Sequence, residues 1–260
     1  MKSPDAKVRT EAIAELEQSG SDKALVALIG LLGDADAGVS AAAEAALVKH
    51  GKAASGLLVT GFAGTAKATF PKYEAVLLKI GKPAVPALMG GLAGTEAVAS
   101  HAAAVLSKMP NGVAVLGHVL SRGAAKAKLR AATVLAGMGT RPAKMALLPA
   151  LAVWDHAVRD VATKALKPLF GDKKVTTGIL GMFKNATFDQ AYALTLSVYD
   201  HPDPQVHNEI VFGFHTARTT YARHALFGSL VMRDKAWYGR IAAGVSHPSP
   251  RAREHIIKAL

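Results

Sequence analysis

Leucine or isoleucine recurs along this chain at a nearly constant interval. The positions are Leu16, Leu47, Leu77, Leu106, Leu135, Leu166, Leu196, Leu226 and Ile256, with steps of 29 to 31 residues. Such a period is typical of a solenoid, in which each unit buries its apolar face against the next unit. The sequence therefore predicts an all-α fold, an α-α superhelix of about eight helical hairpins plus a terminal helix.

Helix breakers follow the first six of these positions at a fixed distance of four residues. They are Gly20, Gly51, Gly81, Pro110, Gly139, and Phe170 directly before Gly171. A helix that ends at a glycine in the left-handed conformation, turns and restarts makes a helical hairpin. We expect each repeat to be one such hairpin.

Apolar residues upstream of the periodic leucines follow helical spacing. The stripes on the first helices are Val8, Ala12 and Leu16; Val39, Ala43 and Leu47; and Val158, Ala162 and Leu166. Second helices carry similar stripes, such as Leu25, Leu28 and Leu32. We expect these faces to be buried between neighbouring hairpins.

Proline replaces glycine as the helix breaker after about residue 187, in His201-Pro202-Asp203-Pro204 and His247-Pro248-Ser249-Pro250. Because proline suits the first turn of a helix, we expect turns followed by helix starts there. Helices are predicted at 187–199, 203–215, 217–232, 235–245 and 249–260. The whole chain is expected to form one repeat domain over 1–260, regular over 1–185 and looser over 186–260.

Two kinds of segment resemble HEAT-like repeats of the phycobilisome-lyase type. Gly81-Lys82-Pro83-Ala84-Val85-Pro86-Ala87-Leu88 resembles the opening of their second helix, and Asp155 to Leu166 and Pro4 to Arg9 resemble their first helix. The resemblance implies an α-solenoid. It says little about function, because the family includes scaffolds, chromophore lyases, a di-iron hydroxylase and DNA glycosylases.

Positive charge is concentrated after the first two repeats. Residues 1–60 carry 6 Lys and Arg against 8 Asp and Glu, whereas the rest carries 25 against 11. Cations recur just after the turn inside each repeat, at Lys52, Lys82, Arg141, Lys144, Lys173 and Lys174. Stacked repeats would align them into a ridge that binds an acidic partner. The alternative is that they interact favourably with the C-terminal end of the preceding helix, or that they only keep an apolar protein in solution.

A later cluster interleaves arginines with aromatic residues. Its members are Arg218, Tyr221, Arg223, Trp237, Tyr238 and Arg240. Aromatic rings could stack bases while the cations hold phosphates, which indicates nucleic-acid contact. The alternative is that the rings belong to the core or to the end cap of the stack.

No constellation in the sequence indicates catalysis, and neither a cofactor nor a metal is expected. The densest histidines, His201, His207, His215 and His224, lack the spacing of ligands on one helix face. Trp154-Asp155 with Asp160 faintly resembles the Trp and Asp pairing of HEAT-like alkylpurine DNA glycosylases, but the spacing does not match. We interpret Trp154-Asp155 as a turn between repeats, with the aspartate at a helix start.

The leading hypothesis is a non-catalytic repeat scaffold that binds a protein partner, an acidic segment or helix, along an extended basic surface. The alternative is a nucleic-acid-binding HEAT-like protein related to alkylpurine DNA glycosylases. The longest apolar stretches fall well short of the roughly 20 residues that span a bilayer, so no membrane insertion is expected. The N-terminus lacks the apolar region of a secretory signal, which favours a cytoplasmic protein. The absence of cysteine excludes disulfides and thiolate chemistry.

Overall fold

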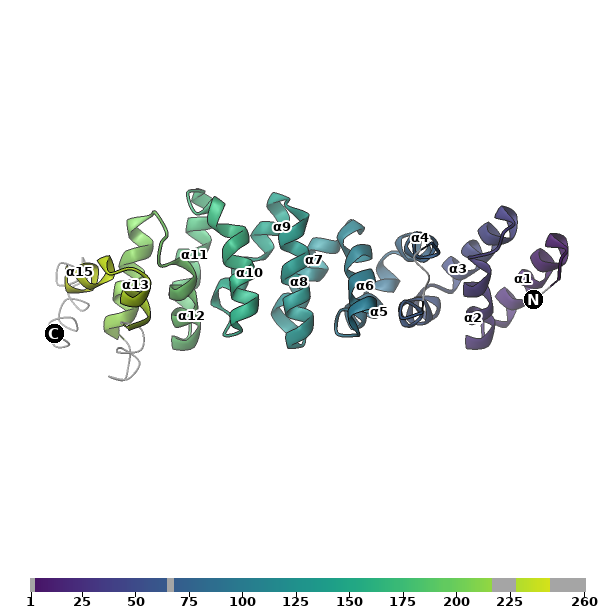
Figure 1. The fold of residues 1–260 in the computed structure, drawn as a ribbon, viewed down its shortest axis with the longest axis horizontal. Helices are drawn as coiled ribbons and strands as arrows, with labels where there is room; N and C mark the ends of the chain where they lie inside the picture. Colours follow the sequence, from purple (N-terminus) through teal and green to yellow (C-terminus); the bar gives the residue numbers. More distant parts are fainter. Residues whose placement is uncertain (1–2, 65–67, 217–227, 244–260) are drawn as a thin grey trace. The chain divides into compact units, whose positions relative to one another are not determined.

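The computed structural model describes residues 3–64, 68–216 and 228–243, and these form helices joined by turns, with no strand (Figure 1). Consecutive helices pack against one another, so the fold class is all-α and superhelical, as predicted. The chain forms two compact units, residues 1–134 and 135–260, with the boundary inside α8 (Ala125–Met138). The expected single domain over 1–260 stays a prediction.

Unit 1 is a row of helical hairpins. Its elements before α8 are α1 (Ala6–Ser19), α2 (Asp22–Leu31), α3 (Ala37–Gly61), α4 (Phe70–Ile80), η1 (Lys82–Ala84), α5 (Val85–Leu92), α6 (Glu96–Lys108) and α7 (Gly112–Arg122). The element α3 is itself a hairpin, because its backbone leaves the helical conformation at Gly51. First helices pack on first helices, as α4 does on α6, and second helices pack on second helices, as α5 does on α7.

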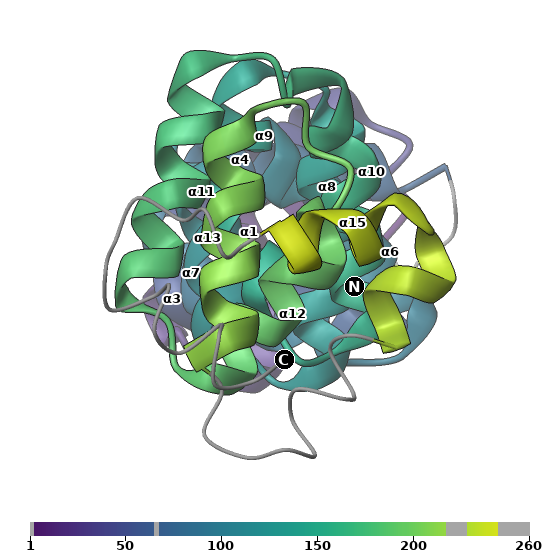
Figure 2. The same cartoon turned by 90° about the vertical axis from the view of Figure 1, so that its left-hand side faces the viewer.

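Unit 2 shows the same alternation of first and second helices. Its elements are α9 (Arg141–Ala146), η2 (Leu148–Ala152), α10 (His156–Leu166), η3 (Lys167–Leu169), α11 (Lys173–Asn185), α12 (Phe188–Val198), α13 (Pro204–Thr216), a helical segment at 228–233 and α15 (Ala236–Ala242). The first helix α10 packs on α12, and the second helix α11 packs on α13 (Figure 2). Both α12 and α13 were predicted within two residues at each end.

Glycine makes the turn inside four of the predicted hairpins. Gly20, Gly51, Gly81 and Gly139 have φ between 49° and 68°, a region that side chains with a Cβ rarely adopt. The turns at Pro110 and at Phe170-Gly171 are built without a positive φ. Met109 there is extended, and Phe170 stays in the right-handed helical region.

Short polar side chains start many of the helices. Asp5, Asp36, Asp155 and Asp172 each accept a hydrogen bond from a backbone N–H in the first turn of the helix that follows. Such capping satisfies donors that have no partner inside the helix. The interpretation of Asp155 as a helix start is therefore confirmed.

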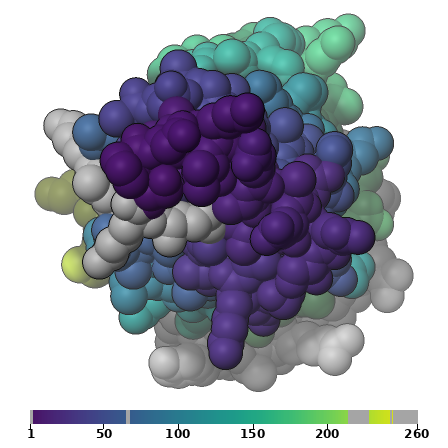
Figure 3. All heavy atoms as spheres, turned by 90° about the vertical axis from the view of Figure 1, so that its right-hand side faces the viewer, coloured from purple at the N-terminus to yellow at the C-terminus, as the bar shows by residue number. Residues whose placement is uncertain are grey.

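The periodic leucines form the centre of the core, and Leu47, Leu77, Leu106, Leu135 and Leu166 are fully buried. Leu16 and Leu196 are only half-buried, and Leu226 and Ile256 lie outside the described residues. The prediction that Val8 is buried is wrong, because its side chain is 48% exposed. Its helix α1 lies on the face of the unit seen in Figure 3.

The predicted helices at 217–232 and 249–260 lie wholly or largely outside the described residues. Within the described part, no single helix is long and apolar enough to cross a membrane. Only α4 together with the segment Lys82–Leu92 has the necessary length and composition, and this pair is bent by 113°.

Candidate partner-binding surfaces

The predicted cations after the turns lie at the start of second helices. Lys52, Lys82, Lys173 and Lys174 are exposed, and none of them takes part in an ion pair found among the described residues. We call these four the turn lysines. A cation in the first turn of a helix opposes the helix dipole, so the position does not stabilise its own helix.

The two other predicted cations behave differently. Arg141 Nη2 lies 2.7 Å from a carboxylate oxygen of Asp172, in the next turn of this kind along the chain. This contact holds the pKa of Asp172 below its ordinary value, because the guanidinium hydrogen-bonds the charged carboxylate. Lys144 is half-buried. Arg141 is therefore partly neutralised by its own chain, unlike the turn lysines.

Lysines at the ends of first helices are also paired within the chain. Lys49 Nζ lies 2.5 Å from Glu17, and Lys108 Nζ lies 2.5 Å from Glu74. The same kind of pair joins Lys79 to Glu44 and Lys167 to Asp200. Each pair connects one first helix, or in the case of Lys167 and Asp200 the residues just after it, to the next, so these four junction lysines have a structural partner that the turn lysines lack.

The predicted nucleic-acid cluster is only partly within the described residues. Arg218, Tyr221 and Arg223 lie outside them. Trp237 is completely buried, and the Arg240 guanidinium lies 5.0 Å from the centre of its ring. A buried indole has no free face on which a base could stack, so Trp237 belongs to the core, as the alternative interpretation had it. Tyr238 is 65% exposed.

Two histidines of unit 2, the buried His201 and the half-buried His207, pack among other side chains. His201 is fully buried; its Nδ1 accepts a hydrogen bond from the Asp203 N–H at 3.1 Å, and its Nε2 lies 3.5 Å from the Thr176 hydroxyl. The His207 ring meets the Trp237 ring edge to face, with centroids 5.3 Å apart. Burial is the main cause that lowers the pKa of both histidines. In the described part of the chain, no three His, Cys, Asp or Glu residues are grouped so that they could hold a metal ion.

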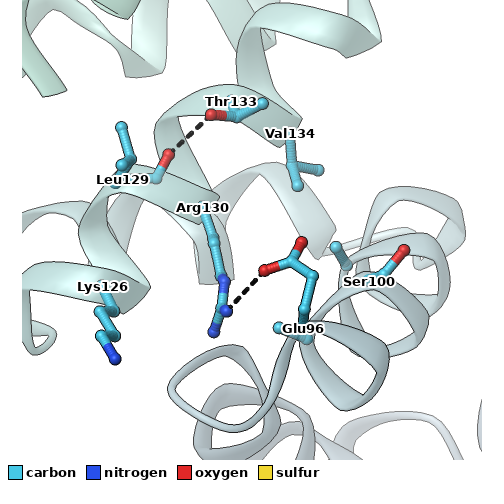
Figure 4. A pocket seen from close by; sticks show the side chains of 9 residues that line it. Glu96, Ser100, Lys126, Leu129, Arg130, Thr133 and Val134 are labelled. Atoms are coloured by element: carbon cyan, nitrogen blue, oxygen red, sulfur yellow. Dashed lines mark hydrogen bonds and ion pairs between the residues drawn. The ribbon is translucent and has the colours of Figure 1, made fainter. Parts of the chain in front are cut away.

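Two open grooves lie between neighbouring helices of unit 1. One, of about 500 Å³, lies between α6 and the start of α8; small residues such as Ala99 and Ala103 line it, and the Arg130–Glu96 ion pair crosses it (Figure 4). The other, of about 430 Å³, is lined by second helices and Tyr73, and includes Val26, which is 55% exposed. Sequence periodicity does not reveal such grooves, because they depend on how far apart the helices pack.

Arginines in first helices hold the turns between repeats. Arg130 Nη1 donates to the carbonyl oxygens of Leu92 and Gly94, and Arg159 Nη1 donates to those of Val153 and Trp154. Arg9 makes the equivalent bond to the Ser3 carbonyl. We call these three the clamp arginines: Arg9 and Arg159 bind the turn directly before their own helix, whereas Arg130 in α8 binds the turn before α6 of the preceding repeat.

The clamp arginines differ in their carboxylate partners. Arg9 forms two hydrogen bonds of 2.9 Å with the Asp34 carboxylate, and Arg130 forms one of 2.8 Å with Glu96. Arg159 takes part in none of the ion pairs found in the described residues, although it is only 8% exposed. Burial lowers its pKa, opposed by the nearby Asp160 carboxylate, but a guanidinium stays charged at neutral pH.

Trp154, whose backbone carbonyl accepts a hydrogen bond from Arg159, carries an exposed ring. Trp154 is 69% exposed and Phe188 is 43% exposed. The Tyr192 ring lies between them, with centroids 6.0 Å from Trp154 and 6.4 Å from Phe188, and its hydroxyl is 2.9 Å from the Ser229 hydroxyl. Sequence reasoning treated Trp154 as part of a turn and did not identify this group.

The chain matches no family model and no curated protein.

Proposed function

We propose that this chain is a HEAT-like repeat scaffold that binds an acidic segment or helix of a protein partner, and that it is not catalytic. The stacked hairpins, the aspartate caps at the helix starts and the clamp arginines support the repeat assignment. The observation that carries the binding proposal is the contrast between two sets of lysines. The junction lysines are paired, whereas the turn lysines are exposed and stand where they oppose a helix dipole.

Lysines at positions that lower helix stability are explained if a ligand binds to them. An acidic segment laid against the turn lysines of either unit would supply the missing counter-charges. The open grooves of unit 1 would accommodate apolar side chains of the same kind of partner. The burial of Trp237 weighs against nucleic acid as the partner, because it removes the larger ring of the predicted base-stacking cluster.

The experiment compares two quadruple variants that lose the same net charge. The first changes Lys52, Lys82, Lys173 and Lys174 to Gln; the second changes the junction lysines Lys49, Lys79, Lys108 and Lys167 to Gln. A fluorescein-labelled peptide of sixteen glutamates serves as the probe, and binding is followed by anisotropy at several salt concentrations. Each unit holds two turn lysines, so at about 0.4 kcal/mol per exposed contact the first variant is expected to bind about fourfold more weakly.

The second variant is expected to bind within about twofold of the unmodified protein, since its lysines already have partners in the chain. Equal weakening in both variants would show that net charge alone attracts the probe, and the proposal would then be wrong. Labelled duplex and single-stranded oligonucleotides form a separate arm. Tighter binding of either oligonucleotide than of the peptide would replace the protein partner by a nucleic acid.

A further inference from the structure

The three clamp arginines allow a comparison within one chain. All three donate through Nη1 to carbonyl oxygens before a first helix, Arg9 and Arg159 before their own helix and Arg130 before α6 of the preceding repeat. Two of them also hold a carboxylate of the chain itself. Arg159 is the exception in the described residues, although it is more than nine-tenths buried.

The sequence shows why the carboxylate is missing. Asp34, the partner of Arg9, stands two residues before Asp36, which caps the next first helix. Two residues before Thr187, which caps the first helix after α10 and α11, stands Asn185. The Asn185 amide is turned back to the Gly181 carbonyl of its own helix, with an N···O distance of 3.2 Å. By sequence position relative to the capping residue, a neutral side chain therefore stands where the other repeat has the carboxylate.

Neighbouring acidic groups are already in use. Asp155 accepts a hydrogen bond from the Val158 N–H, and Asp160 lies 3.2 Å from His156 Nε2. A second cation, Arg233, is close enough to oppose the charge of Arg159. A charged guanidinium at low exposure is stabilised by a carboxylate that binds it with two hydrogen bonds.

We propose that Arg159 binds a carboxylate of a protein ligand and that the exposed ring of Trp154 covers an apolar residue next to that carboxylate. The ligand carboxylate takes the position that Asp34 occupies beside Arg9. The aromatic and arginine composition is that of residues that dominate binding energy in protein interfaces. The site lies at the turn between repeats, at the end of α10 opposite to the one that leads to Lys173 and Lys174. It deepens the proposed function, on which it rests for the acidic character of the partner.

The test uses the capped tripeptide acetyl-Leu-Asp-Leu-amide and its neutral counterpart acetyl-Leu-Asn-Leu-amide. The chain has two tryptophans, so the indole N–H signals in a ¹H–¹⁵N spectrum of the full chain are assigned with the single variant Trp154→Phe. The aspartate peptide is expected to shift the Trp154 signal saturably with a Kd of about 1 mM. The signal of the buried Trp237 serves as the internal reference.

Two variants examine the guanidinium. Arg159→Gln is expected to weaken binding at least about tenfold, the usual weight of a charge-assisted pair. Asn185→Asp leaves the clamp intact and supplies a carboxylate from the chain, so it is expected to weaken binding to a similar degree. Unchanged binding in Asn185→Asp would overturn the proposal even if Arg159→Gln failed to fold.

Other outcomes also decide the matter. If the Trp154 signal did not shift, or shifted equally with the asparagine peptide, Arg159 would not bind a carboxylate and the proposal would be wrong. A shift with inorganic phosphate but not with the peptide would identify a phosphate site instead and overturn the proposal. The tripeptide carries one charge and is too short to test the turn lysines. Its failure therefore leaves the glutamate-peptide experiment, and the proposed function, standing.

Discussion

Gly91 of α5 lies directly against Val59 of α3, so closely that a Cβ added to Gly91 would lie 2.9 Å from Val59 Cγ1. It would also lie 3.0 Å from the Cβ of Ala102 in α6. Two neighbouring hairpins thus approach the same backbone position. The preceding residue, Gly90, is exposed and has no atom within 4 Å of such a Cβ.

These adjacent glycines give opposite predictions. Gly91→Ala is expected to lower the free energy of unfolding by about 1–3 kcal/mol, because the new methyl group overpacks three helices. Gly90→Ala is expected to raise it by about 0.5–1 kcal/mol, because alanine loses less chain entropy in a helix. Urea unfolding followed by circular dichroism measures both. The same sign for the two variants would contradict the packing described here.

Gly81 tests the turn inside the hairpin. Its φ of 68° and ψ of −129° lie in a region open essentially to glycine alone, while its N–H bonds the Leu77 carbonyl at 3.0 Å. Gly81→Ala is expected to destabilise the protein by about 1–3 kcal/mol through backbone strain. The control is Gly56→Ala in the second half of α3, where the φ is negative and no atom lies nearby. Thermal unfolding of the two variants is expected to shift in opposite directions.

Variants of Arg130 and Glu96 separate the contribution of the hydrogen bonds from Arg130 to backbone carbonyls from that of the Arg130–Glu96 ion pair. Arg130→Gln is expected to cost about 1–2 kcal/mol, because it leaves the carbonyls of Leu92 and Gly94 without their donor. Glu96→Gln is expected to change stability by less than about 0.5 kcal/mol, since the Glu96 side chain is 87% exposed and its pair is screened by water. If both variants lost the same free energy, the ion pair rather than the carbonyl bonds would hold the turn.

The buried histidines predict a pH dependence of unit 2. Burial, the largest cause, lowers the pKa of His201 and His207 below 6.5. The carboxylates of Asp200 and Asp203 raise the pKa of both histidines and so oppose the effect of burial, whereas the charge of Arg240 lowers the pKa of His207 further. The unfolded chain then binds protons at a higher pH than the folded one. Stability is therefore fully present above pH about 7 and falls as the pH drops through about 6.5, until the folded histidines are protonated as well.

Fluorescence of the buried Trp237, in a Trp154→Phe background, reports the unfolding of this unit in urea. The urea midpoint is expected to fall from pH about 7.5 to pH about 5.5. His201→Gln is expected to flatten this dependence, and His156→Gln, a change at an exposed imidazole, is expected to leave it unaltered. A flat profile in the unmodified protein would show that these histidines do not become neutral on folding.

The hairpins could be predicted from the sequence because the same physical signal is repeated. Burial of Leu47, Leu77 and Leu106 follows from the period, and four of the turns follow from glycines that adopt a positive φ at the end of a helix. The prediction for Val8 failed because the period marks the apolar face of a helix but does not show whether another helix covers that face. The burial of Trp237 could not be predicted, because spacing alone does not separate a buried ring from an exposed one.

The clamp at Arg159 was missed for a different reason. Arg9 and Arg159 each stand four residues after a capping aspartate, so the local sequences look alike. The difference lies about 25 residues further on, in Asp34 and Asn185. Aligning the repeats on their capping residues would have revealed it, whereas aligning them on the leucines did not.

The junction lysines have a consequence for how a chain of this kind can change its length. Glu44 and Glu74 stand three residues before a periodic leucine, and Lys79 and Lys108 stand two residues after one. Excision of residues 45–74 would bring Glu44 into the place of Glu74, opposite Lys108. A gene that loses or duplicates such a segment therefore keeps a Glu–Lys pair between the two repeats that become neighbours. The polypeptide can in this way lose or gain whole repeats without further mutation.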